Sequence, residues 1–181
     1  MQLSLSSRTL TLSSASAVLL GAQVASAALI ASYEVGTGAS SSMLQFDFEN
    51  GNSYLYTVYW NGEQTGEDLF SVVAAAQPET FMFEVIEFSF GNQLVGVGIG
   101  SDYNFGVGTK PLYLDFWHYW RRDSSDQAWA QPAMGFSDRI VTDGSWDGWV
   151  FGSNGVPAAV PAPSVLAAAM LYIAGARRRR G

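Results

Sequence analysis

Strict alternation of apolar and polar residues over 43–49 is the feature that most constrains the fold of this chain. In an extended strand the polar residues of this run, which include Gln45 and Asp47, lie on the face opposite the apolar ones. The Asn-Gly pair at 50–51 follows directly, and it favours a tight turn because both residues tolerate positive φ. Residues 54–60 are rich in aromatic and β-branched side chains, so we expect them to form the returning strand. The sequence therefore predicts a β-hairpin whose first strand is buried on one face only.

One helix is predicted after the hairpin, over 65–76. Thr65 can cap its amino end, and Asp68 stands three residues later, as in a capping box. Apolar residues then recur at helical spacing from Leu69 to Ala76, which predicts one packed face. Pro78 lies just beyond the end, where proline commonly follows a helix.

The remaining periodic segments favour strands rather than helices. We expect an α+β fold, in which a mostly antiparallel sheet carries a single packed helix, and an all-β sandwich is the alternative. The further strands are predicted at 81–90, 94–99 and 112–120, with shorter ones near Trp129 and over 146–151.

Residues 1–27 have the composition of a secretory signal peptide. They contain no acidic residue and one base, Arg8, followed by a short stretch of small and apolar residues. Ala25 and Ala27 form an A-x-A cleavage pattern directly before Ala28. We therefore expect export, with Ala28 as the first residue of the mature chain.

Residues 160–181 have the features of a second targeting signal. Pro161 and Pro163 lead into an apolar run over 165–176, and Arg177–Arg180 follow it. As a helix this run spans about 18 Å, which is shorter than the hydrocarbon core of a bilayer. The four arginines are expected to stay on the cytoplasmic side, which leaves the body of the chain outside.

This order of proline motif, short apolar segment and arginine cluster resembles the PEP-CTERM sorting signal. Ala162 stands where the V-P-E-P motif of that family has Glu, which leaves the subtype of the matching enzyme open. The resemblance implies processing by an exosortase, a membrane-bound Cys transpeptidase-like enzyme. It also implies transient anchoring in the inner membrane, followed by release to the cell surface or the extracellular matrix. The residues that carry the resemblance are Val160, Pro161, Pro163, Arg177, Arg178, Arg179 and Arg180.

Between the two signals we expect one acidic globular domain over 28–152, a linker of small residues over 153–159, and the sorting signal over 160–181. Residues 28–155 hold all sixteen acidic residues but only four bases, a formal charge of −12. Such a surface repels nucleic acid and anionic lipid. The chain has no Cys and one His, which excludes disulfides, thiolate metal sites and cysteine nucleophiles.

Three features of this domain form a recognisable order: Trp60-Asn61-Gly62 ahead of the predicted helix, the aromatic stretch 116–120, and the segment 141–145. With these features the stretch from Trp60 to Phe151 is similar to the transcobalamin-like C-terminal domain, a β-grasp module. The likeness implies a β-grasp-like sheet and a small ligand.

One loop has the spacing of a calcium site. Asp143, Ser145 and Asp147 place oxygen atoms at loop positions 1, 3 and 5, and Gly148 stands at position 6. Asn154 occupies position 12, where such a loop needs a bidentate Glu. A polar turn shaped by its Asp and Gly residues is therefore favoured, with calcium as the alternative and no other cofactor expected.

Trp117, Tyr119, Trp146 and Trp149 gather in the C-terminal third of the chain. They are candidates for an aromatic platform that stacks on sugar rings, but large aromatics also commonly fill the core of a small domain, and we favour the core. No catalytic motif passes the spacing tests for a nucleophile, a carboxylate pair or a phosphate loop.

The function predicted from the sequence is therefore that of an exported, exosortase-processed surface or matrix protein with a non-catalytic domain. A carbohydrate-binding module and a transcobalamin-like small-ligand domain are the alternatives. The expected partners are the secretion machinery, the exosortase and, for the first alternative, a polysaccharide; nucleic acid is not expected.

Overall fold

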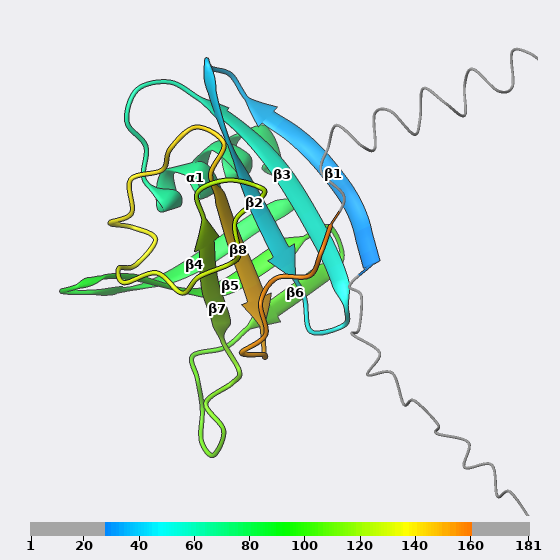
Figure 1. Ribbon diagram of the computed structural model, residues 1–181. Coiled ribbons are helices and arrows are strands. Elements are labelled where there is room, and N and C mark those ends of the chain that lie inside the picture. The colour runs from blue at the N-terminus through cyan, green and yellow to red at the C-terminus, as the bar shows by residue number, and fades with distance from the viewer. Residues whose placement is uncertain (1–27, 161–181) are drawn as a thin grey trace, which may run out of the picture.

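The structure is a computed structural model, and it describes residues 28–160. Within this range the chain forms two β-sheets and one helix (Figure 1). The domain is thus mostly β with a single helix, as the sequence predicts. The elements in chain order are β1 (Ala28–Gly36), β2 (Ser40–Asp47), β3 (Asn52–Trp60), α1 (Gly66–Ala76), β4 (Phe81–Phe88), β5 (Gly91–Ile99), β6 (Asp102–Phe105), β7 (Trp117–Arg122) and β8 (Trp146–Phe151).

The large sheet has five strands in the order β1-β3-β2-β8-β7, and the small sheet has three in the order β4-β5-β6. In the large sheet β1 pairs with β3 in parallel, and β2 pairs with β8 in parallel. The other neighbours, β2–β3, β7–β8, β4–β5 and β5–β6, are antiparallel. Antiparallel pairing therefore dominates, and the two parallel pairs bring distant segments of the chain together.

The predicted hairpin is confirmed as β2 and β3. Phe46 lies opposite Tyr54, and the turn between the strands is closed by hydrogen bonds between Phe48 and both Gly51 and Asn52. Gly51 has φ of 86°, a conformation that glycine adopts without strain. The polar face of β2 differs from the prediction, because Gln45 and Asp47 are buried.

The predicted helix is also confirmed. Asp68 N donates to Thr65 Oγ1 at 3.1 Å, and Thr65 N donates to Asp68 Oδ2 at 2.8 Å, which completes the capping box. The buried face of α1 is centred on Leu69, Phe70 and Val73. This face packs on the large sheet, as its apolar spacing requires.

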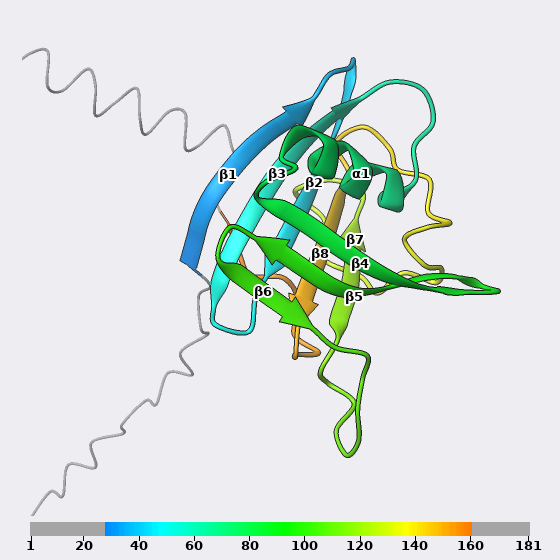
Figure 2. The ribbon, with the colours of Figure 1, turned by 180° about the vertical axis from the view of Figure 1, so that it is seen from behind.

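The core lies between the large sheet on one side and the helix with the small sheet on the other (Figure 2). Phe70 of α1 contacts Phe46 of β2 edge to face, with ring centroids 5.3 Å apart, and contacts Trp149 of β8 at 5.6 Å. Phe81 of β4 packs on the same rings. Such tilted and edge-on pairs are the favoured arrangement of aromatic rings. We call this side of the large sheet the inner face.

The opposite side of the large sheet, which we call the outer face, is covered by two irregular segments. One is the loop 123–132, and the other is a strap, 152–160, that leaves β8 and passes in front of the sheet towards β1 (Figure 1). Pro157 of the strap is buried, so part of the segment predicted as a linker packs on the sheet. This cover explains why the polar residues of β2 are buried.

Two predicted strands differ from the structure. The strand predicted at 112–120 begins only at Trp117, because Asp115 instead accepts a hydrogen bond from the backbone N–H of Thr109 and closes a loop. Near Trp129 there is no strand in the described residues, but a single bridge pairs Ala130 with β7. The edge strands β1 and β6 were not predicted.

No helix among residues 28–160 is long and apolar enough to cross a membrane. The predicted signal peptide, 1–27, and nearly all of the predicted sorting signal, 161–181, lie outside the described residues.

The packing of the strap on the sheet predicts a large effect of Gly148→Ala. A Cβ at this position would overlap Pro157 Cγ and would lie 2.9 Å from Cη2 of Trp129. We expect the free energy of unfolding to fall by about 2 kcal/mol, the usual size of an overpacking effect, as measured by urea denaturation. Gly135→Ala is the control, because its Cβ would meet no atom closer than 3.7 Å. Equal stability of the two variants would contradict this packing.

Candidate functional site

The strap is held by a polar clasp on the outer face. Gln45 Nε2 donates to the carbonyl oxygen of Ala158 at 2.8 Å, and the N–H of Ala158 donates to Asp47 Oδ2 at 2.6 Å. Ser53 Oγ also donates to Asp47, at 2.6 Å. Burial nevertheless raises the pKa of Asp47 above its ordinary value, against these hydrogen bonds. The buried amide of Gln45 thus binds the carbonyl group of Ala158, and the buried carboxylate of Asp47 binds its N–H.

Beside the clasp lies a cleft with a volume of about 940 Å³. The strap forms one wall and the segment from Arg122 to Trp129 forms the other, while Trp146 and Val150 of β8 lie at its base. A concave site of this size with a few polar groups is the usual form of a small-molecule site.

Arg122 is the cationic group of this cleft. Its guanidinium carbon lies 4.4 Å from the ring centroid of Trp129 and 4.0 Å from that of Trp146. Its Nη1 donates to the carbonyl oxygen of Ser125 at 3.1 Å, but its Nε is buried without a hydrogen-bond partner. Burial lowers the pKa of Arg122, and no carboxylate of residues 28–160 lies within ion-pair distance of it. The cleft therefore contains a guanidinium without an ion-pair partner among residues 28–160, although the carboxylates of Asp47 and Glu49 also line it.

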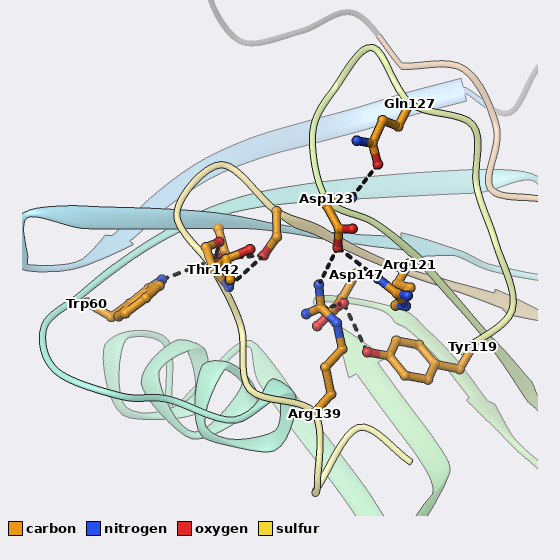
Figure 3. A network of polar contacts seen from close by, with 10 residues as sticks. Trp60, Tyr119, Arg121, Asp123, Gln127, Arg139, Thr142 and Asp147 are labelled. Carbon is orange, nitrogen blue, oxygen red and sulfur yellow. Dashed lines mark hydrogen bonds and ion pairs between the residues drawn. The ribbon is translucent and has the colours of Figure 1, made fainter. Parts of the chain in front are cut away.

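A second polar cluster lies on the inner face, at the start of β8 (Figure 3). Arg139 Nη1 lies 2.8 Å from Asp147 Oδ1, and Tyr119 donates its hydroxyl to the same oxygen at 3.0 Å. Arg139 also lies 3.9 Å from Asp123, which pairs with Arg121 at 2.8 Å. Both Arg139 and Asp147 are buried. This cluster ties the loop before β8 to β7.

Burial dominates the titration of this cluster. It raises the pKa of Asp147 to about 6, although the Arg139 charge and the Tyr119 hydroxyl act in the opposite direction. Burial and the nearby Asp147 charge raise the pKa of Tyr119 as well. Asp147 Oδ2 is buried against the start of α1, where it lies 3.2 Å from the position of a Cβ on Gly66. The carboxylate is thus closed off from a substrate, and the cluster acts as a structural ion pair.

The aromatic residues singled out from the sequence do not form one exposed platform. Trp117 and Trp149 are 3% exposed and pack in the core, whereas Trp146 is 4% exposed and faces the opposite side of the sheet. Tyr119 stacks on Trp149 with ring centroids 4.4 Å apart. Both faces of β7 and β8 are covered, so their large side chains become core.

The residues of the predicted calcium loop each have a separate partner. Asp143 Oδ1 accepts the N–H of Ser41 at 2.7 Å, and Ser145 Oγ lies 3.3 Å from the hydroxyl of Ser42. Asp147 is bound by Arg139, as described above. In the range 28–160 no three His, Cys, Asp or Glu residues gather in a way that could hold a metal ion. The three oxygens therefore fasten the loop to β2 and to Arg139 rather than converge on one point.

Sequence reasoning missed Arg122 and the clasp of Gln45 and Asp47. Arg122 carried a signal, because Arg121 and Arg122 are the only adjacent bases in an acidic domain and Trp129 follows shortly after. Gln45 and Asp47 carried none, since alternation places them on a face that normally meets solvent. No protein-family model matches this chain, and no curated protein matches it either.

The raised pKa of Asp147 predicts a specific pH dependence of stability. The pKa is about 6 in the folded chain against an ordinary 3.8, so the folded state binds this proton more tightly. The stability that this group contributes is complete below its unfolded pKa and is lost as the pH rises through about 6. When the pH is lowered from about 7.5 to about 5, the melting temperature of the unaltered protein should therefore rise more than that of Asp147→Asn.

Asp143→Asn is the matched control for this measurement, because it removes an exposed carboxylate of the same loop and keeps the oxygen that accepts the Ser41 N–H. It should keep the pH dependence of the unaltered protein. If Asp147→Asn keeps that dependence too, the titration assigned to Asp147 is wrong.

Proposed function

We propose that this chain is an exported protein, sorted through an exosortase-type signal, that presents a non-catalytic binding domain at the cell surface or in the extracellular matrix. The observation that carries the proposal is the position of the fold between the two predicted signals. The elements β1 to β8 all lie after the predicted cleavage pattern, Ala25 and Ala27, and before the predicted sorting motif, which starts at Val160.

The clasp supports this division of the chain. It binds Ala158, two residues before Val160, and Val160 packs against the same apolar cluster as Leu29 of β1. Both ends of the described domain therefore lie at the β1 side of the outer face. This arrangement suits a domain that is attached to a membrane through its C-terminal signal and released by cleavage.

A non-catalytic role is supported by the surroundings of the titratable groups. His118 is buried, and its Nε2 lies 3.4 Å from the carbonyl oxygen of Leu114. Asp147 and Asp47 are engaged in the ion pair and in the clasp. Each of these groups has a structural partner, and the serine hydroxyl that contacts Asp47, that of Ser53, is fully buried.

The sorting signal predicts the behaviour of a variant in which Arg177–Arg180 are replaced by Gln. The positive charges hold the cytoplasmic end of an apolar segment that is too short to anchor itself. We expect this variant to be misprocessed or lost from the membrane fraction, as seen by fractionation and immunoblotting. Normal processing and location would refute the sorting proposal.

A second candidate function, binding of a small ligand, is favoured by the cleft. Arg122 lies against the rings of Trp129 and Trp146 and has no ion-pair partner among the described residues, so the ligand class that fits is an aromatic or apolar carboxylate. The likeness to the transcobalamin-like domain also implies a small ligand. This function and the sorting proposal are compatible, because the cleft lies within the domain that is exported.

Benzoate and benzamide test this cleft, since they have the same shape and differ in charge. Benzoate in hundredfold excess over its Kd should stabilise the fold by about 2.7 kcal/mol, which is a rise of several degrees in melting temperature. Benzamide should have little effect. Arg122→Met should lose the response to benzoate while its side chain still covers the two Trp rings. A response that survives in Arg122→Met would show that the cleft is not the site.

A further inference from the structure

The outer side of the small sheet carries two rows of residues that run across its three strands. Each row has a glycine of β5 at its centre and a side chain of β4 and of β6 at its ends. The small sheet faces away from the core on this side (Figure 2). The rows are Met82–Gly98–Tyr103 and Glu84–Gly96–Phe105.

The glycines make this side flat. A Cβ on Gly98 would lie 2.8 Å from Met82 Cγ and 3.4 Å from Tyr103 Cδ2, so these two side chains lie over the bare backbone. A Cβ on Gly96 would lie 2.9 Å from Glu84 Oε1. The outer side of the small sheet is thus a smooth surface rather than a row of upright side chains.

Two aromatic rings on this surface remain accessible. Tyr103 is 50% exposed and Phe105 is 49% exposed, in contrast to the buried Trp residues of the large sheet. They are alternate residues of β6, so their backbones are roughly 7 Å apart on the same side. Tyr103 donates its hydroxyl to Glu84 Oε1 at 2.7 Å, which holds the ring in place.

Two shallow depressions adjoin Tyr103, with volumes of about 300 Å³ and 250 Å³. Hydroxyl, carboxylate and apolar side chains line both of them, Asn50 and Asn104 add amides to the first, and neither is lined by Lys or Arg. Asp102 lines both of them, and hydrogen bonds from Asn52 and Tyr54 lower its pKa, so its carboxylate stays ionised. The ring therefore stands between two sets of hydrogen-bonding groups.

The geometry points to a binding platform for a neutral polysaccharide on the outer side of the small sheet, with Tyr103 and Phe105 as the stacking rings. The apolar side of a sugar ring packs on an aromatic face, and its hydroxyl groups donate to carboxylates and amides. Glu84 supplies such an acceptor beside Tyr103, and the exposed Glu79, which lines the second depression, supplies another.

Charge disfavours three of the other partners that an exposed aromatic surface could bind. The carboxylates around Tyr103 repel acidic polymers and anionic lipid. They also disfavour a second copy of this chain, which would bring Glu84 and Glu79 against like charges. A neutral polymer of hydroxyl groups meets no such repulsion and satisfies the acceptors.

The test is affinity electrophoresis of the full chain, kept in a detergent without sugar groups, through gels that contain hydroxyethyl cellulose, galactomannan or starch. At least one of these neutral polymers should retard the unaltered protein, and Tyr103→Ala should bind about tenfold more weakly. Tyr113→Ala is the matched control, because Tyr113 is also 50% exposed but lies in the loop before β7. It should bind as the unaltered protein does.

Four results would overturn the platform. The first is that none of the neutral polymers retards the unaltered protein. The second is equal binding by Tyr103→Ala and Tyr113→Ala, and the third is equal retardation by alginate, which carries carboxylates. Self-association that Tyr103→Ala abolishes would assign the surface to a second copy instead. Because binding is measured on the purified chain, its failure leaves the export proposal standing, and failed export leaves the platform standing.

Discussion

Parallel pairing of β2 with β8 is the constraint on which the rest of the structure depends. It joins segments far apart in sequence, and the N–H of Ser41 reaches the carboxylate of Asp143, 102 residues away. Because β8 thereby lies inside the large sheet, both of its faces must be covered. Trp149 meets the helix on the inner face, while Gly148 gives room to the strap and the loop 123–132 on the outer face. The core, the buried ion pair and the cleft all follow from the place of this one strand.

The hairpin and the helix could be predicted because residues close together in the sequence determine them. The hairpin needs only alternation, an Asn-Gly turn and a returning strand, and the helix needs only the reciprocal bonds of Thr65 and Asp68 with an apolar face behind them. β1 and β6 do alternate, since Ala31, Tyr33 and Val35 lie on the more buried side of β1 and Tyr103 and Phe105 on the exposed side of β6. They escaped prediction because the alternation is short: β6 has only four residues, and Ile30 interrupts the polar side of β1. β1 in addition pairs in parallel with β3, and no turn signal marks such a partner.

The candidate sites could not be predicted, because pairing between distant segments decides which side chains are covered. Gln45 and Asp47 occupy positions that alternation assigns to solvent, yet the strap lies on them and binds both. Asp147 has the spacing of a calcium ligand, yet its burial beside Arg139 makes it half of an ion pair. In both cases the sequence shows that the side chain is polar and needs a hydrogen-bond or ion-pair partner. Only the tertiary structure shows which residue is that partner.

The layers of the domain also determine where its aromatic residues and its few bases are available. The large aromatic rings between the two sheets are buried in the core. Only a strand with one uncovered side can expose aromatic rings to solvent, and β6 is such a strand. Of the bases, Arg139 is buried with Asp147 and Arg121 pairs with Asp123, whereas Arg122 lies on the outer face of the large sheet. The cleft around Arg122 and the depression beside Tyr103 nevertheless adjoin, because Phe48 and Glu49, in the turn between β2 and β3, line both of them. Ligands on the two surfaces would therefore both approach this turn.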